Sequence, residues 1–428
     1  MLRRMGVFIL ILLCFSGCAP QQSADNDTIV IWHWMTDRQA VLEELAAQYE
    51  AATGVGVDFQ LFSPPGAYSS KIIASAQANN LPDIFGILGE KRDTASFVKA
   101  GHILDLTPYL EENDSQWKNS LFSSTLKVTS FDPRNRFGIG PGSYAVPIDL
   151  MDIQMIYNKR LLTEAGIADY PRTWPEFIAD LKILKGKGVK GFVSGWAATW
   201  LIDCLASNYA FNIMGEDKVF RTIKGEVPYT DPDWLKVFSL FEELRDSGGL
   251  ASGVVTMDNK YAEQLFANEK AAFAFNGSWC VNVYNGMNPD LEYGVILPPQ
   301  VSDQHPVKIW GGAGASLYVN ANSPLKEEAV KFLQWLTAKD QQVYLVNKTR
   351  NLPANREALA EIPQILAEFA DDAQSITHPN MWPYQEYPKV IETFTKGLQS
   401  IIIGEISVQD LASRIQNVKE KELAKEAR

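Results

Sequence analysis

A strand–helix–strand pattern near the start of the chain constrains the fold more than any other feature. Ile29 and Ile31 belong to a short β-branched run, and apolar residues at helical spacing follow over residues 41–49. Gly54 marks the end of that helix, and residues 55–61 then alternate between apolar and polar side chains. A β-α-β unit places its two strands parallel in one sheet. The sequence therefore predicts an α/β protein with a parallel sheet.

Capping residues predict where several helices begin. Thr36–Gln39 and Thr173–Glu176 both have the spacing of a capping box, in which two side chains bond free backbone N–H groups. Asp231–Pro232 and Ser323–Pro324 each place a proline in an expected first turn, where its missing N–H costs little. The charged end of the chain, Lys419–Arg428, is predicted to be a solvated tail or a fraying helix.

The first residues are typical of a processing signal. Val7–Phe15 is apolar but too short to span a bilayer, and small residues precede Cys18. The segment resembles a bacterial lipoprotein signal, in which the cysteine is acylated and becomes the mature N-terminus. An ordinary cleaved signal peptide is the alternative. We expect residues 1–17 to be a lipoprotein signal peptide, Cys18 to carry the lipid, and residues 18–27 to form a polar tether.

Composition sets the number of lobes and argues against several functions. About 400 mature residues with 46% hydrophobic content suggest two lobes, and a net charge of −12 argues against a nucleic-acid partner. The four histidines lack metal-ligand spacing, and phosphate-loop, dinucleotide and G-x-S-x-G motifs are absent. We therefore expect no metal, no cofactor and no catalytic residue. Cys204 and Cys280 are expected to be buried free thiols, with a disulfide between them as the alternative.

Residues that follow predicted strands are the first site candidates. Open parallel sheets bind ligands beyond the carboxyl ends of their strands. Trp34 follows the first strand, and residues 88–92 follow the predicted strand Pro82–Leu88. Trp279 follows the predicted strand Ala272–Phe275 through an Asn-Gly-Ser turn.

Tryptophans beside small residues in loops point to a carbohydrate ligand. The C–H faces of sugars stack on aromatic rings, while their hydroxyls need polar partners. Any single ring is as readily part of a core, and Trp174 and Trp335, at apolar helical spacing, are predicted to be core. The loop set comprises Trp196, Trp200, Trp279, Trp310, Trp382 and Tyr384.

Several segments, taken in order, resemble family 1 extracellular solute-binding proteins, the lipoprotein receptors of sugar-importing ABC transporters. They are LPDIFGI at Leu81–Ile87, MIYNKRLLTEAGI at Met155–Ile167, KAAFAFNGSW at Lys270–Trp279 and LPANREAL at Leu352–Leu359. The resemblance extends over nearly all of Thr28–Asn417. It implies a two-lobed, periplasmic-binding-protein-like α/β fold of type II, with the ligand in a cleft between discontinuous lobes.

The same resemblance implies lobe boundaries and hinges. The N-lobe would comprise residues 28–148 and a return segment at 299–346, and the C-lobe residues 149–298 and 347–428. The hinge would fall near Pro147–Asp149, Pro298–Pro299 and Asn347–Asn351.

The resemblance also implies a set of ligand-binding residues. Trp279 matches a sugar-stacking tryptophan, Glu90 and Arg92 are expected to bond hydroxyls, and Asp149 is expected to supply a carboxylate. The remaining expected contacts are Trp34, Trp196, Trp310, the backbone of Gly311 and Gly312, Trp382 and Tyr384.

The function expected from these features is a membrane-anchored receptor on the outer face of the cell membrane, or in the periplasm. As a monomer, it would capture a mono- or oligosaccharide between closing lobes and deliver it to an ABC permease. A receptor for a polyamine or a glycerol phosphodiester is an alternative, since Glu90 with Asp149 would suit the former and Arg92 the latter. A cell-surface carbohydrate-active enzyme is an alternative of another class, and it would need a close pair of carboxylates.

Overall fold

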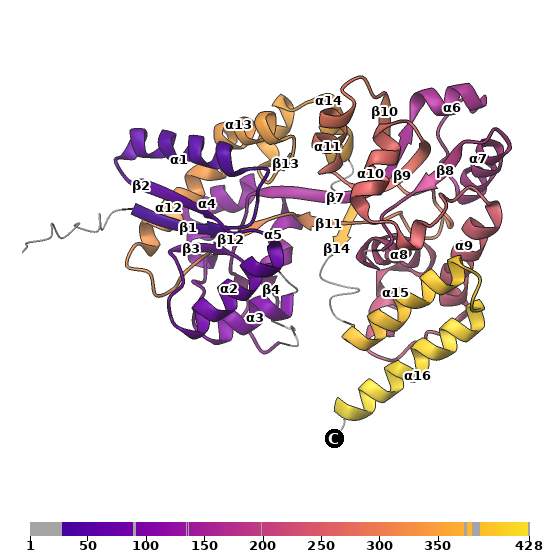
Figure 1. Ribbon diagram of the computed structural model, residues 1–428. Coiled ribbons are helices and arrows are strands. Elements are labelled where there is room, and N and C mark those ends of the chain that lie inside the picture. Colours follow the sequence, from indigo (N-terminus) through magenta and orange to yellow (C-terminus); the bar gives the residue numbers. More distant parts are fainter. Residues whose placement is uncertain are drawn as a thin grey trace, which may run out of the picture.

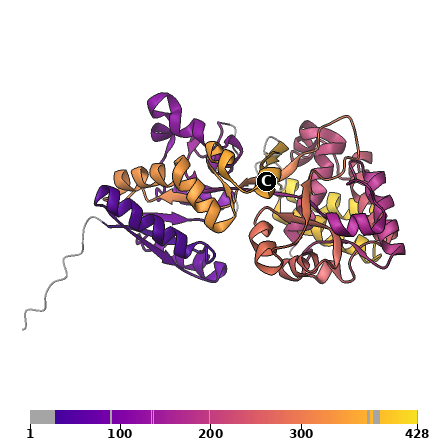
Figure 2. The ribbon, with the colours of Figure 1, turned by 90° about the horizontal axis from the view of Figure 1, so that it is seen from above.

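The chain forms two α/β lobes in the computed structural model (Figure 1). The structure describes residues 28–88, 91–133, 135, 137–197, 199–371, 375–378 and 386–426, with the backbone alone at Pro65, 376–378 and 426. The sites expected at Cys18, Glu90, Trp382 and Tyr384 lie outside the described residues, as do the signal peptide and the tether. Seen from above, the lobes are joined by a narrow waist (Figure 2).

The first lobe is built on a five-stranded sheet of order β2-β1-β3-β12-β6. Its strands are β1 (Thr28–His33), β2 (Gly56–Leu61), β3 (Ile84–Gly86), β6 (Val146–Pro147) and β12 (Ser316–Val319). β1 pairs in parallel with both β2 and β3, which confirms the predicted β-α-β unit. β12 is antiparallel to β3, so a segment from late in the chain completes this sheet.

Helices cover both faces of the first sheet. They are α1 (Gln39–Thr53), α2 (Pro65–Gln77), α3 (Lys91–Lys99), α4 (Thr107–Ser120), α5 (Ser123–Thr129), α12 (Lys326–Leu336) and α13 (Lys339–Thr349), with a small hairpin of β4 (Ser130–Phe131) and β5 (Gly142–Ser143). α1 ends at Gly54, whose φ of 78° lies in the left-handed region that glycine adopts without strain. Its start differs from the prediction, because Arg38 and not Thr36 is the N-cap residue. The Gln39 side chain instead bonds His33 and the Phe59 carbonyl, and so ties the helix to β1 and β2.

The second lobe is built around the long strand β7. Its sheet has the order β14-β11-β7-β9-β8, and β10 and β13 also pair with β7. The strands are β7 (Asp149–Asn158), β8 (Lys190–Val193), β9 (Ala271–Gly277), β10 (Tyr293–Ile296), β11 (Ile309–Ala313), β13 (Leu352–Pro353) and β14 (Ile376–His378). β7 is buried along most of its length.

The helices of the second lobe enclose a large aromatic core. They are α6 (Lys159–Ala165), α7 (Trp174–Gly186), α8 (Thr199–Ile223), α9 (Pro232–Ser247), η1 (Val254–Thr256), α10 (Asn259–Ala267), α11 (Cys280–Met287), η2 (Arg356–Glu361), α14 (Gln364–Asp371), α15 (Pro388–Ile402) and α16 (Val408–Glu426). Thr173 and Glu176 form the predicted capping box of α7, and Asp231 caps α9. Trp174 is a core residue, as predicted. Cys204 and Cys280 are buried free thiols, as predicted.

The charged C-terminal end, predicted to be a solvated tail or a fraying helix, is helical up to Glu426, and one of its lysines is buried. Lys419, in α16, is 1% exposed, and its Nζ lies 2.7 and 2.9 Å from the two carboxylate oxygens of Glu386. Nζ also donates to the Ile223 carbonyl, and the Tyr229 hydroxyl donates to Glu386. These bonds fix α16 against α8 and the segment before α15. A pattern of alternating charges does not reveal that one lysine in it is buried.

Three segments cross between the lobes. The first joins β6 to β7, the second joins β11 to β12, and the third runs from α13 through β13. The return to the first lobe was expected from residue 299, but residues 299–313 belong to the second lobe. Gln300 exchanges backbone hydrogen bonds with the chain at Arg172 and Trp174, and β11 completes the sheet beside β7. The second crossing therefore lies at Gly314–Ala315, not at Pro298–Pro299.

Candidate functional site

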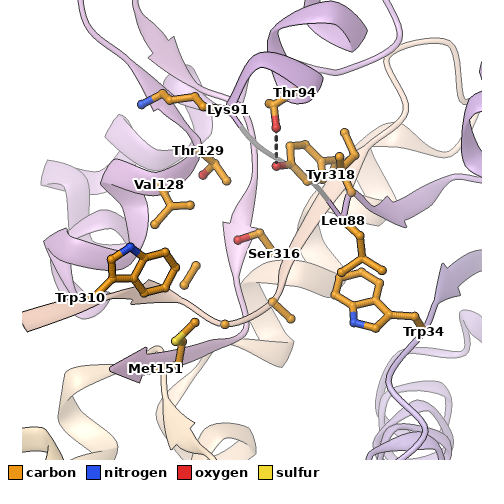
Figure 3. Close-up of a pocket in the computed structure, with 14 residues that line it drawn as sticks. Trp34, Leu88, Lys91, Thr94, Val128, Thr129, Met151, Trp310, Ser316 and Tyr318 are labelled. Carbon is orange, nitrogen blue, oxygen red and sulfur yellow. Dashed lines mark hydrogen bonds between the residues drawn. The ribbon is translucent and has the colours of Figure 1, made fainter. Parts of the chain in front are cut away.

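A cavity of about 160 Å³ lies between the lobes, where β1 and β3 end (Figure 3). We call it the aromatic cavity. From the first lobe it is lined by Trp34, Leu88, Thr94 and Tyr318, and from the second by Met151 and Trp310. In Figure 3, Trp34 and Leu88 face Trp310 and Met151 across this space. The aromatic cavity therefore lies beyond the carboxyl ends of the parallel strands β1 and β3, at the edge of the sheet where ligand-binding residues were expected.

Trp34 is held by a rigid support. Its ring packs against that of Tyr68, with centroids 5.4 Å apart. The Tyr68 hydroxyl accepts from Gly86 N at 2.9 Å and lies within hydrogen-bond distance of the carbonyls of Trp32 and Gly86. A Cβ on Gly86 would lie 2.2 Å from the Trp34 ring, so only glycine leaves room for the indole. The sequence predicted Trp34 but not this support.

Hydroxyl groups line the first-lobe wall. Thr94 Oγ1 and the Tyr318 hydroxyl are 3.0 Å apart, and Ser316 lies on the same strand as Tyr318. Burial raises the pKa of Tyr318 to about 12, so the hydroxyl keeps its proton at neutral pH. Sequence reasoning missed these residues, because single Thr, Ser and Tyr side chains carry no recognisable pattern.

One ammonium group borders the cavity. Lys91 is half-buried at the start of α3, and its Nζ donates to the Lys127 carbonyl at 3.2 Å. Burial lowers the pKa of Lys91 to about 8, and the nearby Asp132 carboxylate opposes that shift. Arg92, expected from the sequence to contact the ligand, is exposed beside it. Arg92 does not line the aromatic cavity.

The second-lobe wall is set by strand register. Trp310 in β11 and Gly277 in β9 both pair with Ile153 in β7, on opposite sides of it. Residues that pair across neighbouring strands lie on the same face of a sheet. Trp310 and Gly277 are separated by two strand spacings, so their backbones lie about 10 Å apart. Ser278 N then donates to Asp152 O at 2.9 Å, so the chain leaves β9 beside Asp152 and turns at Trp279 into α11.

Trp279 is paired with a second tryptophan. Its ring centroid lies 5.8 Å from that of Trp200, with the planes inclined at 51°. Trp200 is 42% exposed, whereas Trp279 is half-buried. The Trp279 indole N–H donates to Glu263 Oε1 at 3.2 Å. Glu263 lies in α10, where it is indistinguishable in sequence from a solvent-facing helical residue.

Asp149 has a different role from the one expected. It is 3% exposed, and its Oδ2 lies 2.7 Å from Nη2 of Arg38, which is 8% exposed. Asp149 Oδ1 accepts from Ala315 N at 2.5 Å. The carboxylate therefore ties the start of α1 to two crossing segments and does not face the aromatic cavity.

Trp196 also departs from the expectation. It has no exposed surface and packs between Phe192 and Phe241, with ring centroids 5.6 and 6.2 Å away. It is a core residue of the second lobe, because the loop that carries it turns inward after β8. Gly311 and Gly312 pair with Asp152 and Met151 within the sheet, beside Trp310.

A second cavity, of about 250 Å³, is also lined by Trp34. Asp37, Arg38 and Ser63 line it, and it shares Trp34, Gly314 and Ala315 with the aromatic cavity. Within the described ranges, no group of three His, Cys, Asp or Glu residues is arranged to hold a metal ion. No helix among the described residues is long and apolar enough to cross a membrane.

Two α/β lobes, three crossing segments and a cavity between the lobes define a two-lobed, type II periplasmic-binding-protein-like fold. The family model described as bacterial extracellular solute-binding protein matches residues 32–343. Because this match covers more than half of the chain, the protein belongs to that family. The resemblance seen in the sequence motifs is thereby confirmed.

Several known proteins are similar to the chain over most of its length. The melibiose/raffinose/stachyose-binding protein MelE of Bacillus subtilis strain 168 is 25% identical over 402 residues, which are 90% of this chain and 85% of MelE. A maltooligosaccharide ABC transporter solute-binding lipoprotein of Streptococcus pneumoniae serotype 4 is 23% identical, covering 82% of this chain and 78% of the relative. A solved chitin oligosaccharide binding protein has a TM-score of 0.75 at 22% identity, covering 92% of this chain and 98% of that one. This last likeness shows the fold.

Proposed function

We propose that the protein is an extracytoplasmic receptor that captures a sugar between its two lobes and delivers it to an ABC importer. The observation that carries this proposal is the aromatic cavity, in which Trp34 of the first lobe faces Trp310 of the second. Indole rings match the C–H faces of a sugar, and the hydroxyls of Thr94, Ser316 and Tyr318 match its hydroxyls. The names of the relatives compared above support the same ligand class.

The placement of the two walls suggests how capture would proceed. A ligand that touches both lobes stabilises the closed arrangement over the open one, because it gains contacts only when both walls reach it. The crossings at Pro147–Asp149 and Gly314–Ala315 are short and lie beside the cavity, where a small rotation would move one wall against the other. The closed form would then dock on the permease.

The lining of the aromatic cavity argues against a polycationic ligand and against a hydrolytic role. None of its described lining residues carries a carboxylate, and Lys91 contributes an ammonium group. A polyamine needs several carboxylates around it, and glycoside hydrolysis needs a pair of them. We therefore propose a non-enzymatic receptor for a sugar rather than for a polyamine. Lipid attachment at Cys18 would hold this monomeric receptor at the membrane.

A thermal-shift screen tests the proposal. The panel holds mono- and oligosaccharides, spermidine, glycerol phosphodiesters and a sugar phosphate, applied to the chain that begins after Cys18. A ligand at about 100 times its dissociation constant adds roughly 2.7 kcal/mol to the free energy of unfolding, which raises the melting temperature measurably. We expect only saccharides to do so.

Variants of two tryptophans link the shift to the cavity. Trp310→Ala should abolish the shift caused by the best saccharide. Trp335→Ala serves as the control, because Trp335 packs on the first-lobe core through α12 and does not line the aromatic cavity. A shift by spermidine or a phosphodiester alone, or one that survives in Trp310→Ala, would refute the proposed site.

A further inference from the structure

A further cavity, of about 360 Å³, is lined by residues of α11, β10 and α14 and by the residue that follows α13 (Figure 1). We call it the basic cavity. Lys159, Asn285, Glu292, Tyr293 and Arg350 are among its lining residues, and it shares none with the aromatic cavity. We propose that the basic cavity binds a phosphate group between the guanidinium of Arg350 and the ammonium of Lys159. This proposal does not depend on the proposed function.

The two cations of the basic cavity lack a counter-charge. Among the described residues, neither the ammonium of Lys159 nor the guanidinium of Arg350 forms an ion pair or a hydrogen bond. The neighbouring Arg160, by contrast, pairs with Glu164 and Glu269. The lining therefore carries more positive than negative charge, although the whole chain has a net charge of −12. Like charges that face one space repel each other, and an anion between them removes that repulsion.

The backbone of Arg350 also points to a use for its side chain. Arg350 is the C-cap residue of α13, and its φ of 53° lies in the left-handed region. Helices that end in this way usually place glycine there, because a Cβ is strained in the left-handed conformation. An arginine at such a position has an energetic cost, and binding through the guanidinium gives a reason for it.

The groups around the basic cavity match the chemistry of a phosphate group. A planar guanidinium can donate two parallel hydrogen bonds to two phosphate oxygens, and an ammonium adds a compact charge. Asn285 and Tyr293 add neutral donors. Burial raises the pKa of Tyr293 and the positive charge of Arg350 opposes that shift, so the guanidinium acts on the same phenol. The phosphate group can belong to a small molecule in solution or to a lipid headgroup.

The first experiment is isothermal titration calorimetry with inorganic phosphate. It uses the chain that begins after Cys18, at low ionic strength, where charges are screened least. Arg350→Gln and Lys159→Gln should each weaken phosphate binding by on the order of tenfold. Glu292→Gln should strengthen it, because the variant removes the carboxylate that repels the ligand. Lys236→Gln, which removes an exposed cation of α9 outside the cavity, is the control and should bind as the wild type does.

Arg350→Gly separates the charge of the side chain from the strain of the backbone. Glycine adopts the left-handed conformation without strain, so this variant should melt no lower than the wild type. It should nevertheless lose phosphate binding to the same extent as Arg350→Gln. A folded Arg350→Gly variant that binds phosphate as tightly as the wild type would overturn the proposal, and this test holds even if Arg350→Gln is unstable.

Sedimentation with lipid vesicles identifies the source of the phosphate group. The same chain, which has no lipid anchor, is mixed with vesicles of phosphatidylglycerol or, for comparison, of phosphatidylcholine. Sedimentation with phosphatidylglycerol that is lost in Arg350→Gln assigns the site to an anionic lipid headgroup. Binding of inorganic phosphate without sedimentation assigns it to a phosphate compound in solution. If the wild type shows neither, or if Arg350→Gln and Lys159→Gln both bind as the wild type does, the proposal is refuted.

Discussion

Replacing Asp149 distinguishes a structural carboxylate from a ligand contact. Asp149 accepts hydrogen bonds from Arg38 at 2.7 Å and from Ala315 N at 2.5 Å, and both charged side chains are more than nine-tenths buried. Asp149→Asn keeps an acceptor for Ala315 but leaves the buried guanidinium of Arg38 with only the more exposed carboxylate of Asp37, whose Oδ2 lies 3.5 Å from Arg38 Nε. Removing one partner of a buried ion pair costs about 3–5 kcal/mol.

The measurement is the free energy of unfolding from urea denaturation, followed by circular dichroism, together with the affinity for the best saccharide. We expect Asp149→Asn to lower the free energy of unfolding by about 3 kcal/mol or more. The affinity of the folded protein should change by less than about threefold, since Asp149 does not line the aromatic cavity.

The matched control removes both charges. The unpaired buried charge is the main cost of breaking a buried ion pair, so Arg38→Met combined with Asp149→Asn, which keeps an acceptor for Ala315 N, should recover much of the lost free energy. A normal free energy of unfolding in Asp149→Asn with a large loss of affinity would refute this reasoning. It would return Asp149 to the ligand-binding set that the sequence suggested.

Three further predictions concern the cavity walls and the C-terminal helix. Gly86→Ala should displace the Trp34 ring and weaken saccharide binding, and overpacking should lower the free energy of unfolding by about 1–3 kcal/mol. Titration calorimetry measures the saccharide affinity, and Gly66→Ala is the control because a Cβ there meets nothing within 4 Å. The pKa of Lys91 is about 8 in the folded protein, which is below its value in the unfolded chain. Above pH 8, Lys91 therefore binds a proton more often in the unfolded state than in the folded state. The free energy of unfolding should accordingly rise from pH 8 toward pH 10. Denaturation at several pH values should show this rise in the wild type and a smaller one in Lys91→Met. Lys419→Met should lower the free energy of unfolding, measured by urea denaturation, by about 3–5 kcal/mol, because it leaves the buried carboxylate of Glu386 without its counter-charge. A decrease of less than about 1 kcal/mol would mean that this carboxylate is solvated.

The features that sequence reasoning predicted correctly depend on short stretches of chain. The capping box at Thr173 needs only four residues, and Gly54 ends α1 through its own φ. Alternation over residues 55–61 produces β2, although the strand begins one residue later. Trp34 lines the aromatic cavity at the sheet edge where it was expected, because the end of a parallel strand is recognisable from the strand itself.

The site residues that were missed or misassigned depend on distant contacts. Trp196 and Trp200 stand four residues apart in a stretch predicted to be a loop, yet Trp196 is fully buried and Trp200, which lies in α8, is 42% exposed. Glu263 accepts hydrogen bonds from Asn276 and Trp279 only because β9 brings both residues to α10. Tyr318 reaches the aromatic cavity because the chain returns to the first sheet more than two hundred residues after β3.

The sequence by itself determined the β-α-β unit, the capping of α7 and α9 and the family, because periodicity, capping and motif order are properties of neighbouring residues. Only the tertiary structure decided which polar and aromatic groups meet. Asp149 pairs with Arg38 across 111 positions, and Lys419 is buried against Glu386 although charged residues surround it in the sequence. The physical reason is that burial and pairing depend on how the two sheets and the crossing segments place distant parts of the chain against one another.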